Sequence, residues 1–311
     1  MKKELSVQRN MKKRQILERM WNNRFLYLLL LPSVAYIIFF NYIPFNGVKI
    51  AFQNYNIFSP ELSEWVGLDN FKQIFSNSEI YVTIWNTLLL SLLTLVTEFP
   101  ITIIFALLIN EVTSSGFKKT VQTISYLPHF LSWISVIGIA TALYSRDGLI
   151  NNLISMITGS TTPILFMSEQ WFFIPDVIIL SIWKEMGWGS ILYLAAITGV
   201  DESLYEAAML DGAGRLKQVW HITLPSILPT IVIMLIWRIG GLLGSNFELV
   251  YGLQNPFINF EVISTFIYKR GIAGGDYAIS TAYGLFNGVV NAILLILANY
   301  FAKKTTEVGI F

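Results

Sequence analysis

Long uninterrupted hydrophobic runs dominate the pattern along this chain. Runs of about 18 to 25 residues are long enough to cross a hydrocarbon core of roughly 30 Å as helices. They are too long for the strands of a membrane barrel and lack the alternation of a barrel wall. The pattern predicts an all-α, polytopic membrane protein with six transmembrane helices, at residues 25–42, 84–109, 124–143, 172–200, 227–243 and 283–301.

Composition agrees with a membrane protein and excludes several kinds of chemistry. Of 311 residues, 54% are hydrophobic and 13% are charged, whereas soluble domains carry about 25% charged residues. The chain has no cysteine, so thiol catalysis and disulfides are excluded. His129 and His221 lie too far apart to form a metal-ligand motif, so we expect no metal site. Paired aspartates within the runs, a Ser–His arrangement and an HExxH motif are all missing, which argues against an intramembrane enzyme.

Lysine and arginine residues predict the orientation in the membrane. They gather in the tail 1–24, at Lys118 and Lys119, at Arg215 and Lys217, and at Lys303 and Lys304. With six crossings all these positions fall on one side, which predicts cytoplasmic termini in a multi-pass protein of the cell membrane. Lys269 and Arg270 are the exception, in a long gap where the rule weakens. The basic tail either only fixes this topology or also binds anionic membrane lipid.

The same pattern divides the chain into four parts. They are a basic tail (1–24), a first transmembrane helix with an extracytoplasmic loop (25–79), a five-helix core (80–303) and a short C-terminus (304–311). The core contains a polar connection at 201–225, which we call the EAA loop. The long gaps on the outer side hold aromatic residues and glycine, which predicts folded loops or short interfacial helices there.

The EAA loop contains the amphipathic stretch EAAMLDGAGRLKQVWHITLP. Asp201 is a plausible helix cap, and one side of the helix that follows carries Leu204, Ala207, Ala208 and Asp211. Gly212 permits the turn that ends this helix. A second short helix follows, and the prolines of LPSILP are expected to separate it from the fifth span. The stretch holds no nucleophile, base or metal set, so it is either a docking surface or a helix lying on lipid head groups.

This stretch resembles the EAA signature of the permease subunits of ABC importers. Glu206, Ala207 and Ala208 are followed after three residues by Gly212, and after nine more by Ile222, Leu224 and Pro225. The resemblance implies a type I (MetI-like) permease core whose loop sits in a cleft of an ATPase subunit. Glu206 would pair with a basic residue there, the two alanines would fit the cleft, and Gly212 would form the elbow. The coupling residues it implies are Leu204, Glu206, Ala207, Ala208, Asp211, Gly212, Leu224 and Pro225.

A wider resemblance covers nearly the whole chain. LLPSVAYIIFFNYIPFNGVKIAFQNYN, WVGLDNFKQIF and WKEMGWGSILYLAAITGVDESLYEAA are similar to carbohydrate-importing permeases of the lipoprotein- and polysaccharide-linked branch. This implies a second homologous permease, two ATPase subunits, an extracellular solute-binding lipoprotein, and an oligosaccharide or polysaccharide fragment as cargo. The chain contains no G-x-x-x-x-G-K-[ST] loop, so ATP and Mg²⁺ are expected on the ATPase partner, with no cofactor and no nucleic acid bound here.

Four ionisable residues lie near the middle of the hydrophobic runs: Glu98, Lys184, Glu185 and Arg238. A charge at the bilayer centre costs about 2.5–3.5 kcal/mol on insertion scales, so each is expected to face protein or water. Pairing, such as Glu98 with Arg238 or Lys184, explains them, and so does a hydrated path. Lys184 and Glu185 are neighbours that point about 100° apart on a helix, so we expect them not to face one partner.

Sugar sites combine aromatic faces with amide or charged groups. The candidates for a substrate path are Trp183, Lys184, Glu185, Trp188, Asn246, Glu248 and Asn287. Aromatic belts at the membrane surface explain the tryptophans equally well. The sequence therefore predicts the non-catalytic pore subunit of an ATP-driven carbohydrate importer. The alternative is a stand-alone transporter driven by an ion gradient, which would explain the buried charges but leave the EAA stretch without a role.

Overall fold

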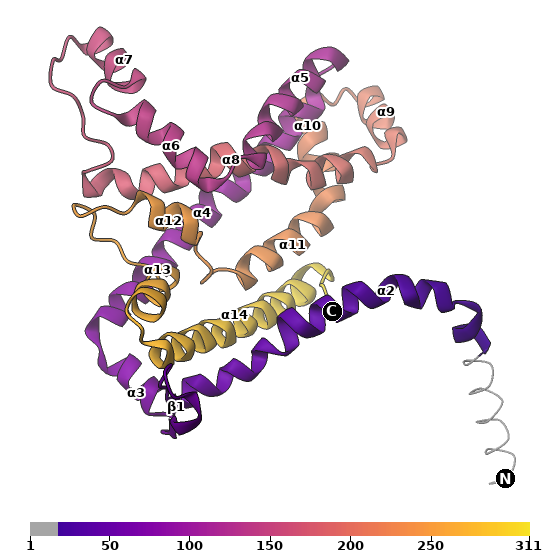
Figure 1. Cartoon of the computed structure of the whole chain (residues 1–311). Coiled ribbons are helices and arrows are strands. Elements are labelled where there is room, and N and C mark those ends of the chain that lie inside the picture. The colour runs from indigo at the N-terminus through magenta and orange to yellow at the C-terminus, as the bar shows by residue number, and fades with distance from the viewer. Residues whose placement is uncertain (1–17) are drawn as a thin grey trace, which may run out of the picture.

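The protein is an open bundle of long helices in a computed structural model that describes residues 18–311 (Figure 1). Within these residues, the helical segments long and apolar enough to cross a membrane are Arg24–Phe52, Ser78–Glu111 (α4), Gln170–Thr198 (α8), Arg215–Gly240 and Tyr277–Thr306 (α14). A bent helix pair supplies a sixth crossing if it counts as one span. The predicted all-α membrane fold is confirmed. The predicted basic tail (1–24) falls largely on residues 1–17, which lie outside the described residues.

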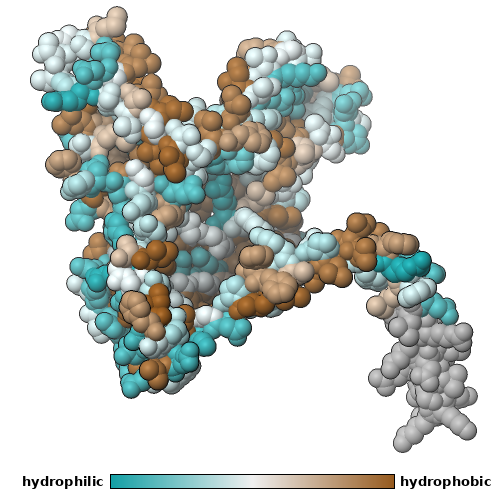
Figure 2. Space-filling view, viewed as in Figure 1, coloured by the Kyte–Doolittle hydropathy of each residue, from teal (hydrophilic) through white to brown (hydrophobic). Residues whose placement is uncertain are grey.

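The first segment lies apart from the bundle except at its C-terminal end. It consists of α2 (Arg24–Ile37), the π-helical turn η1 (Ile38–Tyr42) and the 3-10 helix η2 (Pro44–Phe52). It runs past the predicted end because Pro44 occupies the first turn of η2, where a missing N–H costs nothing. None of α2 is buried within the described chain, and its hydrophobic surface is visible along the arm in Figure 2. Only η2 packs closely on α14.

The predicted third span at 124–143 is wrong as a single helix. The chain forms α5 (Ser115–Tyr126) with the 3-10 turn η4 (Leu127–Phe130), and then α6 (Trp133–Tyr144) with α7 (Leu149–Thr158), bent by 105°. Pro128 lies in η4, where it cannot continue the α-helical hydrogen bonds. Ser132 starts the new helix by accepting the Ser135 N–H at 3.2 Å. The break places η4 against α8, with Pro128 buried between them.

The fifth span also differs from the prediction. The short helix α10 (Arg215–Gln218), the π-helical turn η5 (Val219–Thr223) and α11 (Leu224–Gly240) form one continuous run of 26 residues. The break expected at LPSILP is therefore wrong. The π turn immediately before α11 rearranges the hydrogen bonds at the position where Pro225 would otherwise interrupt them. The real break comes after Gly240, where the chain turns into the short helix α12 (Phe247–Leu253).

Short elements occupy the gaps that were predicted to be folded. Strands β1 (Gln53–Asn54) and β2 (Glu64–Trp65) pair antiparallel, with η3 (Pro60–Leu62) between them and α3 (Asp69–Ser76) after them. Before α14 the chain forms α13 (Ile263–Ile267) and the π turn η6 (Tyr268–Ala273). The buried Asn70 side chain ties the first of these regions together by donating to the carbonyls of Ala51 and Gln53, both at 2.9 Å.

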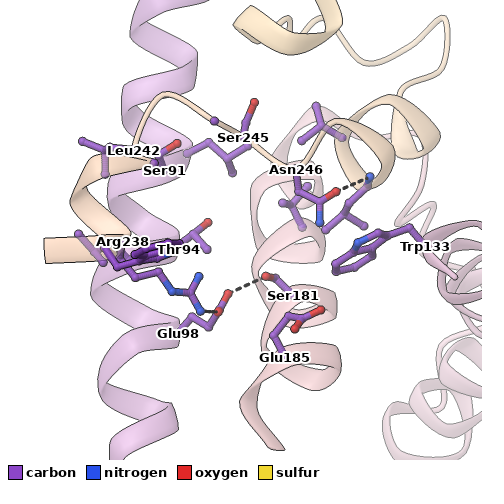
Figure 3. A pocket seen from close by; sticks show the side chains of 18 residues that line it. Ser91, Thr94, Glu98, Trp133, Ser181, Glu185, Arg238, Leu242, Ser245 and Asn246 are labelled. Carbon is purple, nitrogen blue, oxygen red and sulfur yellow. Dashed lines mark hydrogen bonds and ion pairs between the residues drawn. The ribbon is translucent and has the colours of Figure 1, made fainter. Parts of the chain in front are cut away.

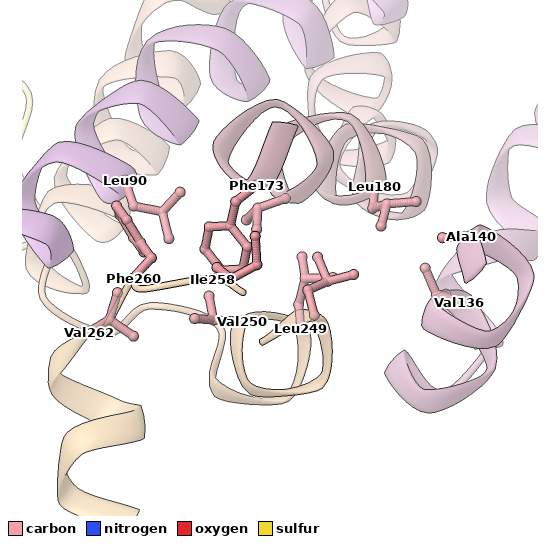
Figure 4. Close-up of a cluster of buried hydrophobic side chains, with 12 residues drawn as sticks. Leu90, Val136, Ala140, Phe173, Leu180, Leu249, Val250, Ile258, Phe260 and Val262 are labelled. Carbon is pink, nitrogen blue, oxygen red and sulfur yellow. The ribbon is translucent and has the colours of Figure 1, made fainter. Parts of the chain in front are cut away.

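The packed centre joins α4, α6, α8 and α12 (Figure 4). Leu90 of α4 and Phe173 of α8 contact a cluster that includes Leu249 and Val250 of α12 and Val136 of α6. These residues are almost fully buried, and apolar burial contributes about 25 cal/mol per Å² of buried surface. The packing holds α12 against α8, so the chain that leaves α11 returns into the bundle.

Gly187 allows the closest helix approach in this core. A Cβ atom at Gly187 of α8 would lie 2.0 Å from the backbone oxygen of Ser125 in α5. We expect Gly187→Ala to push these helices apart. The loss of stability should be about 3 kcal/mol or more, the upper end of the range typical of overpacking. Thermal unfolding of the purified protein in detergent measures this. Gly138→Ala on α6, where nothing lies within 4 Å, is the matched control and should be tolerated. Equal melting temperatures for the two variants would contradict the close crossing.

Candidate functional site

A cavity of about 410 Å³ lies where the interrupted helices meet (Figure 3). Its walls come from α4, α6, α8, α11 and α12 and from the turn between α11 and α12. The volume is in the range of small-molecule sites in proteins. Its polar and indole-bearing lining residues are Ser91, Thr94, Glu98, Trp133, Ser181, Glu185, Trp237, Arg238, Ser245 and Asn246.

An ion pair crosses one wall of the cavity. Glu98 on α4 is 2% exposed and pairs with Arg238 on α11, while the Ser181 hydroxyl donates to the second carboxylate oxygen at 2.7 Å. Figure 3 shows the guanidinium reaching across from α11 to this carboxylate. The predicted pairing of Glu98 with Arg238 is confirmed, and Lys184 has other partners. Both carboxylate oxygens thus have donors, which an anion buried in a membrane requires.

Lys184 and Glu185 of α8 both face His129 of η4, which corrects the expectation that they cannot share a partner. Lys184 donates to the backbone oxygen of His129 at 2.5 Å, and Glu185 contacts the Nδ1 atom of the ring at 2.9 Å. The two positions do diverge on the helix. However, the long lysine side chain reaches the backbone of η4 while Glu185 meets the ring, and the two charged groups lie 3.6 Å apart.

These contacts stabilise the break between α5 and α6. Carbonyl groups at the end of a helix have no partner within the helix, and a cation there also interacts favourably with the helix dipole. Lys184 is 4% exposed and supplies that cation, with its ammonium group 5.1 Å from the centre of the Trp133 ring. Trp188 stacks on the His129 ring with centroids 4.5 Å apart. Lys184 and Trp188 therefore hold the break in place.

Of the predicted path residues, Glu185 and Asn246 line the cavity. Trp183 and Glu248 are exposed and do not line it. Asn287 lies on α14 beside Asn291, whose side-chain oxygen accepts the Leu243 N–H at 3.1 Å, so this pair positions the turn between α11 and α12. The structure adds lining residues that sequence reasoning missed: Ser91, Thr94, Trp133, Ser181, Trp237 and Ser245. The helical spacing of Ser91, Thr94 and Glu98 was a usable signal, since these positions share one face.

The EAA loop forms the helix α9 (Glu202–Leu210), which ends in a Schellman motif. Asp201 caps its start by accepting the Ser203 N–H at 2.9 Å, and the hydrogen bonds from Ser203 hold the pKa of Asp201 below its usual value. At the other end, the Ala213 N–H donates to the Ala208 oxygen at 2.8 Å. Gly212 adopts a φ of +74°, a left-handed conformation that favours glycine.

The implied coupling residues divide by exposure. Ala208 is half-buried, and Leu224 packs beside Ile227 and Tyr193 in the bundle. The exposed ones are Leu204, Glu206, Ala207, Asp211, Gly212 and, in the first turn of α11, Pro225. The α9 helix thus presents a free surface, while Leu224 anchors the loop to the core.

One contact within the EAA loop and one contact to α4 hold the loop in place. The Tyr205 hydroxyl lies 2.9 Å from the Thr223 hydroxyl, joining α9 to η5. Arg215 at the start of α10 lies 3.8 Å from Glu111, the last residue of α4. Among residues 18–311, no group of three or more histidine, aspartate and glutamate side chains is placed to hold a metal ion.

Comparisons with known proteins agree with this architecture. Residues 98–307 match the family model described as "binding-protein-dependent transport system inner membrane component". Protein LplB of Bacillus subtilis (strain 168) is 46% identical over 93% of this chain and 92% of its own length. The polygalacturonan/rhamnogalacturonan transport system permease protein YteP of the same organism is 45% identical over 96% of this chain and 94% of its own length.

Solved structures give the same result at the level of the fold. A chain of a bacterial ABC transporter involved in the import of the acidic polysaccharide alginate aligns with a TM-score of 0.86 and 39% identity, over 94% of this chain and 99% of that one. The alginate transporter has also been solved in complex with an alginate pentasaccharide-bound periplasmic protein, with the same agreement. This chain therefore belongs to the family of binding-protein-dependent inner-membrane transport components, the permeases of ABC importers, as its EAA signature predicted.

Proposed function

We propose that this chain is a non-catalytic permease subunit of an ATP-driven importer and forms half of a pathway for oligosaccharides or polysaccharide fragments. Relatives whose names or descriptions mention polygalacturonan, rhamnogalacturonan and alginate support the carbohydrate cargo. ATP and Mg²⁺ are bound by a separate ATPase, and the EAA loop passes its conformational change to the bundle.

The cavity between interrupted helices is the observation that carries this proposal. Non-helical backbone at membrane depth is tolerated only where protein or a water-filled cavity satisfies it. Here the chain breaks between α5 and α6 and between α11 and α12, and both α6 and the turn into α12 contribute lining residues to the same cavity. Discontinuous helices around a polar site are the usual construction of transporter binding sites. The four charged residues predicted near the middle of the spans are paired, Glu98 with Arg238 and Lys184 with Glu185, so these four residues give the ion-gradient alternative no specific support.

The partners follow from surfaces that one chain leaves exposed. A second, homologous permease supplies the other half of the pathway and covers apolar helix surface such as that of α2. Two ATPase subunits engage the two EAA loops, and an extracellular solute-binding lipoprotein delivers cargo, as the periplasmic protein complex of the alginate transporter supports. Lys217, Lys303 and Lys304 at the EAA end favour a cytoplasmic location for that end and for both termini.

A single-cysteine crosslink tests the assignment of the EAA loop. Because the chain has no cysteine, Ala208→Cys places one unique thiol on α9. In the assembled importer with one cysteine in the ATPase cleft, we expect this thiol to crosslink to the ATPase. Met156→Cys on α7 is the matched control. Residue 156 is 83% exposed, but α7 lies near the start of α8 and α9 follows its end, so this thiol should not react with the ATPase.

ATP-dependent uptake of labelled oligosaccharides into proteoliposomes tests the transport function itself. A thiol at position 208 that never captures the ATPase would contradict the coupling assignment. Uptake driven by a proton gradient with this chain alone would instead favour the ion-gradient transporter.

A further inference from the structure

Asp176 of α8 is a buried carboxyl group without a partner. The residue is 6% exposed, and within residues 18–311 it makes no hydrogen bond and no ion pair. It borders a void of about 10 Å³, which is close to the smallest volume that holds one water molecule. The surroundings therefore leave no room to hydrate an anion. The other residues that line the void are apolar: Phe166, Met167, Phe173, Leu253 and Ile258.

The segments around this carboxyl group supply no cation. Helices α6 and α12, the α7–α8 loop (159–169) and the α12–α13 loop (254–262) contain no lysine, arginine or histidine. No charge occurs at residues 80–97 of α4 or elsewhere on α8 before Lys184. Tyr144 of α6 is close enough to interact electrostatically with the carboxyl group. The other titratable groups of these segments are the exposed Tyr81, Glu169, Glu248 and Tyr251, and Glu261, which pairs with Lys269 at 2.7 Å.

The two loops contact each other at the end of the bundle away from the EAA loop. The Asn255 side chain of the α12–α13 loop donates to the Met167 oxygen of the α7–α8 loop at 2.5 Å. The Asn259 N–H donates to the side-chain oxygen of Gln170, the first residue of α8, at 2.8 Å. We call this set of contacts the outer joint. Two hydrogen bonds thus fasten the α12–α13 loop to the start of α8 and to the loop before it.

Asp176 borders the outer joint from the side of α8. Met167 of one loop and Ile258 of the other line the same void as its carboxyl group. Figure 4 shows Ile258 beside Phe173, which precedes Asp176 on α8. Both α8 and α12 also line the large cavity, so the outer joint connects two walls of that cavity.

We propose that protonation of Asp176 holds the outer joint closed and that its ionisation opens the joint. An unpaired charge in an apolar site costs far more free energy than the neutral carboxylic acid, so the closed joint retains the proton. An open joint admits water, and the carboxyl group then ionises as an ordinary aspartate does, passing its proton to water. Opening becomes easier as the pH rises, and the position of α12 against α8 depends on pH with it.

Hydrogen exchange of the purified full-length protein in detergent tests this proposal. Mass spectrometry follows backbone exchange in peptides that cover the two loops, for the wild type and for Asp176→Asn, at several pH values from 5 to 8. The ratio of the two rates cancels the intrinsic pH dependence of exchange. Because opening releases one proton, we expect this ratio to rise by up to about tenfold per pH unit, and by at least about tenfold between pH 5 and pH 7.

Three further variants assign the effect to one carboxyl group. Asp176→Leu places an apolar side chain in the same site and should show no pH dependence relative to Asp176→Asn, so it also serves as the reference if the asparagine variant does not fold. Asp147→Asn removes an exposed carboxyl group just before α7 and should follow the wild type. Tyr144→Phe removes the nearby phenol and should follow the wild type as well.

Four results would overturn the proposal. They are a rate ratio that stays constant from pH 5 to 8, a pH dependence that disappears in Tyr144→Phe, an equal rise in peptides from α9, which would report global unfolding, and a ratio that changes when choline replaces sodium. The last result would assign the carboxylate to a metal cation instead of a proton. The proposed transport function stands or falls with the uptake measurement and is independent of all four.

Discussion

Gly212→Pro is expected to abolish ATP-dependent uptake while membrane insertion remains intact. Proline fixes φ near −65°, whereas the elbow of the EAA loop holds residue 212 at +74°. The substitution also removes the N–H that donates to the Met209 oxygen at 3.0 Å. The turn between α9 and α10 must therefore change, and the docking surface is reoriented or lost. Uptake and ATPase activity in proteoliposomes measure the effect.

Gly214→Ala is the matched control for this elbow. Residue 214 lies in the same loop with open space around it, but its φ is −70°, which any L-residue adopts. Gly214→Ala should retain uptake. Glu206→Lys should abolish uptake for a different reason: the exposed Glu206 side chain makes no hydrogen bond or ion pair within residues 18–311, so we expect its replacement to affect docking and not the fold. Normal uptake by Gly212→Pro or Glu206→Lys would show that the loop does not couple the ATPase.

Removal of Arg238 is expected to destabilise the bundle strongly. Arg238→Leu leaves the Glu98 carboxylate buried without its cation, and breaking a buried pair typically costs about 3–5 kcal/mol. Glu98→Leu should cost less because the guanidinium is 42% exposed and retains access to water in the cavity. The double variant Glu98→Leu/Arg238→Leu should recover much of the loss.

A double-mutant cycle on thermal unfolding in detergent separates these contributions. A coupling energy near zero, with the two single effects simply adding, would show that the ion pair does not stabilise the helix arrangement. Measurement of uptake on the same samples distinguishes lost stability from lost transport, because a stable double variant without uptake indicates a role for the charges beyond packing.

Periodicity and one motif carried most of the fold prediction. Hydrophobic runs located α4, α8 and α14 to within about six residues at each end, since a straight apolar helix has a simple length requirement. The sequence did not reveal the bend between α5 and α6, because residues 124–143 are mostly apolar on both sides of the break and so have the composition of one span. The prolines of LPSILP gave the opposite error, a predicted break where the helix is continuous. A π turn before α11 accommodates Pro225 within that continuous helix.

The sequence predicted contacts in the site only for charged residues. An ionised group inside a membrane demands a partner, and this requirement pointed to Glu98 and Arg238. Lys184 satisfies the same requirement through a backbone oxygen of η4, which becomes available only because the helix breaks there. The hydroxyl residues of the cavity carry no such penalty within a helix, so their place in the lining depends on how the helices pack.

The two helices joined by the buried ion pair are also joined at the EAA loop. Glu111 ends α4 and contacts Arg215 at the start of the 26-residue run that carries Arg238. The Glu111–Arg215 contact is largely exposed, and exposed pairs contribute only about 0–1 kcal/mol. If the loop is displaced, we therefore expect the two helices to separate at this end first and the buried Glu98–Arg238 pair to stay closed.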